Sequence, residues 1–217
     1  MKVLQRYEQM FRSLAPENLK AQLKRTKGTL GDGAINIILA SIISSIILLG
    51  MGVFQMAIVG TTSMVGDAPF ETALISGMSS TLIILIAIIS PILMVISSLI
   101  VTGVMWAVAK LLGGKGTFTQ QFFQFSYPMG GIVIISSVVG LVPCIGDLIS
   151  IALSLYSLYI AFEIYRSVHK LDDARAILLV ALPIILFILA IILIVVLFAG
   201  VIASIIAGGA ASGAYYS

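Results

Sequence analysis

Charged side chains are scarce in this chain of 217 residues: Asp, Glu, Lys and Arg together make up 10% of it. A soluble domain carries about 25% charged residues. Hydrophobic residues make up 60% of the chain and its mean hydropathy is +1.18, so little polar surface is left to face water. These values exclude an ordinary soluble domain and predict that lipid surrounds much of the protein.

Histidine and cysteine each occur once, as His169 and Cys144. One residue of each kind cannot build a zinc site, and no cluster of Asp or Glu replaces them. A serine nucleophile would need a base at membrane depth, and the sequence places none there. We therefore expect no metal, no cofactor and no enzymatic activity; an intramembrane enzyme is the least favoured interpretation. Cys144 cannot form an internal disulfide and is interpreted as a small core residue.

Five apolar runs are long enough to cross the hydrocarbon core of a bilayer, which takes about 20 residues of helix. Backbone in lipid must satisfy its own hydrogen bonds, and a helix does so within one segment. The sequence therefore predicts an all-α integral membrane protein, with a bundle of five transmembrane helices in residues 34–217. A re-entrant start of the second run is the alternative there. The predicted spans are Ala34 to Val59, Ser79 to Leu112, Phe122 to Val142, Leu148 to Tyr165 and Ala174 to Ala207.

The twelve Lys and Arg residues fall in three segments of the chain: residues 1–27, 110–115 and 166–175. The segments that would lie on the other side of a five-span bundle, residues 60–77, 143–147 and the tail after Gly208, contain none. Because cytoplasmic loops carry an excess of Lys and Arg, this distribution predicts a cytoplasmic N terminus and an external C terminus.

The first 33 residues have a different character. Apolar residues recur at helical spacing with Lys and Arg between them, which predicts an amphipathic helix on the inner leaflet, its bases near anionic lipid. A helix packed under the bundle or onto a partner is the alternative. The apolar residues are Val3, Leu4, Tyr7, Met10, Phe11 and Leu14. A break at residues 15–18 would separate this helix from a second one over residues 17–27. The basic charge by itself gives no support for nucleic-acid binding.

Several local signals add detail to the bundle. Thr117 with Gln120 is typical of a capping box at the start of a helix. Pro91 lies inside an apolar run, where it removes a backbone hydrogen bond and predicts a kink. Asp32 is predicted to cap the first span. Asn36, inside that span, is expected to hydrogen-bond to a neighbouring helix.

Two carboxylates near the membrane are candidate binding residues. Glu163, late in the fourth span, is interpreted either as an interfacial carboxylate paired with Arg166 or Lys170, or as an ion or proton site. Asp147, between the third and fourth spans, is interpreted as a helix cap or as part of the same kind of site. Together with kinked helices, these residues support the alternative function of a small ion or solute transporter.

Small residues recur every four positions near the end of the fifth span. Such rows let two helices approach closely, so they predict either packing within the chain or the seam of a homodimer. The seam residues are Ala199, Gly200, Ala203, Ser204, Ala207 and Gly208.

The stretch from Gly113 to Pro183 resembles the Yip family of Ypt/Rab-interacting membrane proteins. The matching features are the sequence GGKGTF from Gly113, the pair Tyr127-Pro128, and the basic loop beginning at His169. Tyr127 and His169, which lie in these motifs, are further candidate binding residues. The glycine–lysine turn itself is interpreted as flexible.

The resemblance implies five spans and a cytoplasmic N terminus. In eukaryotic members it also implies contact with prenylated Rab GTPases and a role in vesicle traffic. With its short basic N-terminal segment, this chain is similar to the compact members found in archaea and bacteria. The leading hypothesis is a non-enzymatic membrane protein that organises membrane or partner proteins through helix packing and its cytoplasmic face.

Overall fold

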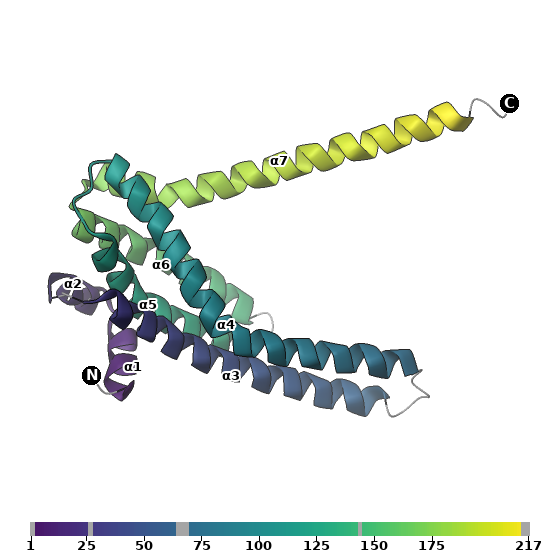
Figure 1. Ribbon diagram of the computed structural model, residues 1–217, viewed down its shortest axis with the longest axis horizontal. Coiled ribbons are helices and arrows are strands. Elements are labelled where there is room, and N and C mark those ends of the chain that lie inside the picture. The colour runs from purple at the N-terminus through teal and green to yellow at the C-terminus, as the bar shows by residue number, and fades with distance from the viewer. Residues whose placement is uncertain (1–2, 26–27, 64–69, 143–144, 214–217) are drawn as a thin grey trace.

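Long helices account for most of the protein in the computed structural model (Figure 1). The structure describes residues 3–25, 28–63, 70–142 and 145–213, and among these it leaves out the side chains of residues 25, 52–81, 83 and 200–213. Within this part of the chain there are seven helices and no strand. The helices are α1 (Val3–Arg12), α2 (Pro16–Arg25), α3 (Leu30–Ser63), α4 (Phe70–Leu111), α5 (Phe118–Val139), α6 (Ile145–His169) and α7 (Asp173–Gly213).

Five of these helices contain segments that are long and apolar enough to cross a membrane, which confirms the predicted number of spans. The segments are Leu30–Met51, Ile84–Leu111, Phe118–Val139, Ile145–His169 and Asp173–Ala199. A break between two N-terminal helices is confirmed, but it lies at residues 13–15 and not at 15–18, because α1 ends at Arg12 and α2 already begins at Pro16.

The connection between the first two spans is shorter than predicted. α3 continues to Ser63 and α4 begins at Phe70, so much of the expected loop over residues 60–77 is helical. α4 is one continuous helix from Phe70 to Leu111, and the alternative of a re-entrant start is therefore wrong. Figure 1 shows α4 changing direction part-way along, and Pro91 lies near its midpoint, as expected for a proline that removes one helical hydrogen bond.

Helices α3 and α5 form the centre of the bundle, with α4 against α3 and α6 against α5. Gly130 of α5 allows this close approach, since a Cβ atom there would lie 3.3 Å from the Cβ of Ala40 in α3. Aromatic side chains of α5 fill the space between its neighbours: Phe122 is fully buried and Phe123 nearly so. The polar start of α5 is fixed by the predicted capping box of Thr117 and Gln120, which the structure confirms.

Helix α7 leaves the bundle after its first turns and runs apart from α3 and α4 (Figure 1). Every large apolar side chain from Ile184 to Phe198 is exposed, so lipid or another protein must cover this part of α7 in a membrane. Of the predicted seam residues, Ala199 is exposed. Gly200, Ala203, Ser204, Ala207 and Gly208 continue the helix, and their side chains lie outside the described residues.

Candidate functional site

A chain of polar contacts ties α1 to the bundle. The Arg6 side chain is buried, and its guanidinium donates to Asp32 Oδ1 at 2.8 Å and to Asn36 Oδ1 at 2.8 Å. Asn36 Nδ2 in turn donates to Ser126 Oγ of α5 at 2.9 Å, which confirms the predicted contact of Asn36 with a neighbouring helix. Arg6 therefore links α1 to α3 through charge-assisted hydrogen bonds, and Asn36 extends the chain of contacts to α5 through a neutral one.

Asp32 was predicted to cap α3, and the structure corrects this assignment. The helix begins at Leu30, and Asp32 lies in its first turn. Its backbone N–H donates to Thr29 Oγ1 at 3.1 Å, while Thr29 Oγ1 lies 2.8 Å from Asp32 Oδ2. Thr29 is thus the residue at the helix start, and Asp32 is left with one carboxylate oxygen for Arg6.

Apolar contacts complete the docking of α1. Met10 is fully buried beside Gly130, where a Cβ atom would lie 3.1 Å from the Met10 sulfur. The Tyr7 hydroxyl donates to the Leu39 carbonyl at 3.0 Å, and burial raises the pKa of this hydroxyl, which keeps it a donor. The Tyr156 hydroxyl of α6 donates to the Leu14 carbonyl just after α1.

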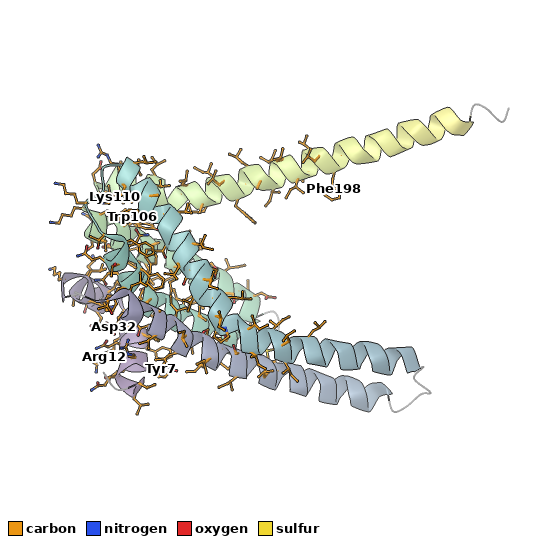
Figure 2. All side chains as sticks on the ribbon, viewed as in Figure 1. Tyr7, Arg12, Asp32, Trp106, Lys110 and Phe198 are labelled. Atoms are coloured by element: carbon orange, nitrogen blue, oxygen red, sulfur yellow. The ribbon has the colours of Figure 1, made fainter. Side chains whose placement is uncertain are left out.

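The structure therefore supports the alternative in which α1 packs onto the bundle. In Figure 2, Tyr7 and Arg12 lie on α1, and Asp32 lies close by at the start of α3. Leu4 and Phe11 remain exposed, so contact of this other face with lipid stays a prediction. Periodicity alone could not separate the two faces, because both carry apolar residues.

The glycine–lysine turn between α4 and α5 is firmly held, contrary to the flexible turn that was expected. Lys115 N–H donates to the His169 carbonyl at 2.9 Å, and Trp106 Nε1–H donates to the Gly116 carbonyl at 3.2 Å. A Cβ atom on Gly116 would lie 2.6 Å from the Val168 carbonyl oxygen, so no other residue fits without a backbone shift. The motif serves close packing of this turn against the end of α6.

His169 was predicted in a loop, but it is the last residue of α6 and is fully buried. Its Nε2 lies 2.7 Å from Gln121 Oε1, and Gln121 Nε2 donates to the Thr102 carbonyl at 3.2 Å. Tyr127 is also buried, with its ring 5.3 Å from that of Phe123 in an edge-to-face contact. Phe123 is on the same helix, and Tyr127 also belongs to a buried cluster with Met10 of α1 and Ala40 of α3. Both candidate residues thus pack between helices, and the structure shows neither on an open surface.

The two candidate carboxylates lie far apart. Glu163 pairs with Lys20 of α2 across 3.7 Å, not with Arg166 or Lys170 as expected, because Asp173 holds Arg166 at 2.9 Å. Asp147 is exposed in the first turn of α6. Sixteen residues of one helix separate it from Glu163, a distance of about 24 Å. The structure therefore does not bring these two groups into one site.

A cavity of about 370 Å³ lies between α3, α4 and α5, and sequence reasoning missed it. Six serines contribute to its lining: Ser41, Ser44, Ser45, Ser90, Ser136 and Ser137. The Ser45 and Ser90 hydroxyls are 2.8 Å apart and join α3 to α4. The serine pairs inside apolar runs were the available signal, since hydroxyls at membrane depth face other helices rather than lipid.

All three basic segments meet at one end of the bundle. Lys20 of α2 reaches α6, Lys115 bonds to the end of α6, and the Arg175 guanidinium donates to the Leu112 carbonyl at 3.0 Å. Figure 2 shows Lys110 and Trp106 at this end, with Phe198 far along α7. Among the described residues, no group of three or more His, Cys, Asp or Glu side chains could hold a metal ion.

Comparison with known proteins agrees with this architecture. The Yip1 domain family matches residues 16–194, from the first residue of α2 to well inside α7. No curated protein and no solved structure matches the chain. The family match spans most of the chain and all five membrane-crossing helices, and α1 lies outside it. This multi-pass integral membrane protein therefore belongs to the Yip1 domain family.

Proposed function

We propose that this protein is a non-enzymatic organiser of membranes or partner proteins, acting through its basic end and its unpartnered helix. In this proposal the basic end is cytoplasmic and the C terminus is external, as the distribution of Lys and Arg favours. The supporting observation is the docking of α1 on α3 and α5, which holds a short amphipathic helix in place beside the basic residues.

The physical basis of a membrane-shaping role is the position of α1. Figure 1 shows α1 running across the direction of α3, and Leu4 and Phe11 are exposed on it. An amphipathic helix lying in one leaflet adds area to that leaflet only, which favours curvature. Because Arg6 and Met10 fix α1 to the spans, its insertion would act on the bilayer at every copy of the protein.

The test combines proteoliposomes with crosslinking. Vesicles containing the protein should become smaller or tubular in electron micrographs, and a Leu4→Ser, Phe11→Ser variant should lose this effect while it remains folded. Crosslinking in native membranes should capture a second copy or another protein; a small GTPase is the partner class that the family resemblance suggests. A monomer with unchanged vesicles and no crosslinked partner would refute the proposal.

The serine-lined cavity supports a second candidate, a small transporter or channel. Its hydroxyls are polar groups between the spans, and Pro91 breaks the hydrogen bonding of α4 next to Ser90. Flux of monovalent cations into liposomes should then fall in a Ser45→Ala, Ser90→Ala variant. Glu163→Gln should leave flux unchanged, because Glu163 does not line this cavity. Absence of any flux above that of empty liposomes removes this candidate.

A further inference from the structure

We propose that the basic end contains a binding site for a lipid head group with two phosphates, formed by α2, the end of α6 and the glycine–lysine turn. The inference rests on the proposed function, because it requires this end of the bundle to face the inner leaflet. Its physical basis is a pair of adjoining cavities with an excess of cationic side chains.

The two cavities share a wall. The first, about 400 Å³, lies between α2 and α6, and the second, about 280 Å³, lies between α2, α6 and the start of α5. Leu23 of α2 and Ser167 of α6 line both. Neither residue is charged, so the wall separates two cationic compartments without placing a charge between them.

Cations dominate both linings. Lys20, Lys24 and Arg166 surround the first cavity, and Lys115 and Lys170 surround the second. The one carboxylate in either lining, Glu163, leaves a formal excess of four positive charges (five minus one), or three when Asp173 beside Arg166 is included. Clusters and pockets of Lys and Arg at a cytoplasmic membrane surface bind the phosphate-bearing head groups of anionic lipids.

Three of the five cations lack an anionic partner. Within the part of the chain that the structure describes, Lys24, Lys115 and Lys170 take part in no ion pair. The pair between Lys20 and Glu163 is long, at 3.7 Å, and 58% of the Lys20 side chain is exposed. These lysines repel one another across the shared wall, and a doubly charged anion would relieve that repulsion.

The backbone conformation at Lys170 supports a binding role for its side chain. Lys170 directly follows α6 with a φ of 53°, in the left-handed region where glycine is the usual residue after a helix. It is the one residue other than glycine with positive φ among those the structure describes. A lysine here accepts backbone strain, and its side chain lines the second cavity together with Lys115.

The depth of the site suits a lipid rather than a free ion. Tyr156 and Tyr159 stack on α6 with ring centres 5.8 Å apart. Tyrosine is enriched at the membrane–water interface, and the proposal places this pair there. Arg166 lies seven residues beyond Tyr159, about 10 Å farther toward the aqueous end of the helix. Exposed apolar residues such as Leu155 continue along α6 on the other side of the tyrosines, where acyl chains can lie.

Two phosphates match the division of the site. Each cavity is lined by at least two cations. A single phosphate could neutralise the charge of only one cavity and would leave the other without an anion. Cardiolipin carries two phosphates joined by a glycerol, and can place one on either side of Leu23. A lipid with a single phosphate should therefore bind more weakly at the same total phosphate concentration.

The experiment is a lipid titration of the full chain in dodecyl maltoside micelles. Trp106 is the single tryptophan and donates to the carbonyl of Gly116, which lines the second cavity, so its fluorescence reports on binding. Tetramyristoyl cardiolipin, dimyristoyl phosphatidylglycerol and inorganic pyrophosphate are compared at equal phosphate concentration. Native mass spectrometry counts bound lipid independently of the fluorescence change.

Of the three compounds, we expect only cardiolipin to bind tightly. Lys24→Ala and Lys170→Gly should each weaken it about fivefold and together about thirtyfold, from about 1 kcal/mol per lysine. Glycine relieves the backbone strain at position 170, so a loss there reports the side chain. Arg12→Ala, which removes an exposed charge outside both cavities, should change the affinity less than twofold.

Three results would overturn the inference: equal binding of phosphatidylglycerol, equal binding of pyrophosphate, or equal losses in Arg12→Ala and Lys24→Ala. Any of these results removes only the lipid site. The proposed function still stands if the protein changes vesicle shape and a partner is still captured by crosslinking. Impermeant reagents that label this end from outside the cell would instead refute the inner-leaflet placement, and both proposals with it.

Discussion

Replacing Arg6 with alanine should release α1 from the bundle. Arg6 is 8% exposed, and its guanidinium makes three hydrogen bonds, two of them to Asp32 and one to Asn36. Breaking a fully buried ion pair costs about 3–5 kcal/mol. The cost here is smaller, because 38% of the Asp32 side chain is exposed and Thr29 still binds its second oxygen.

The remaining loss comes from Asn36. This residue is fully buried and would lose the donor to its side-chain oxygen while it keeps Ser126 as an acceptor. An unpaired buried acceptor costs about 1–3 kcal/mol. Together these effects should weaken the docking of α1 by about 2–3 kcal/mol, which raises the undocked population about 30- to 150-fold.

Hydrogen exchange of the α1 amides in nanodiscs measures this population directly. Protection of residues 3–12 should fall by the same factor, while α5 keeps its protection as an internal reference. Arg12→Ala is the matched control on the same helix. Arg12 pairs with Glu8 and both side chains are exposed, so the protection of the α1 amides should change by no more than about threefold. Unchanged protection in Arg6→Ala, or an equal loss in both variants, would show that apolar contacts alone hold α1.

The remaining predictions concern the basic end. Gly116→Ala should lower the melting temperature in detergent, because the added Cβ atom would lie 2.6 Å from the Val168 carbonyl oxygen. Gly50→Ala is the control and should leave the melting temperature unchanged or raise it, because a Cβ atom there would meet no other atom within 4 Å. His169→Ala should destabilise the protein by about 2–4 kcal/mol in thermal or denaturant unfolding, because it leaves a cavity and an unpaired Gln121 oxygen; a loss below 1 kcal/mol would contradict the buried placement. Cysteines at Lys115 and Lys20, in a chain without Cys144, should react with impermeant reagents from the same face, and labelling from opposite faces would refute the five-span topology.

The sequence by itself determined the membrane class, the number of spans and the grouping of the basic segments. These properties depend on length and local composition: about 20 apolar residues suffice for a span whatever its neighbours are. The capping box at Thr117 and the break before Pro16 were predictable for the same reason, because each is specified by adjacent residues.

Tertiary structure decided the partners of each polar group. Glu163 has candidate cations in Arg166 and Lys170 nearby in sequence, yet it pairs with Lys20, some 140 residues away, because α2 packs against α6. The sequence predicted His169 in a loop, whereas in the structure it is the last residue of α6 and packs against the glycine–lysine turn. The two faces of α1 and the serine-lined cavity likewise exist only once α3, α4 and α5 are assembled, since burial depends on contacts between segments that periodicity within one segment does not encode.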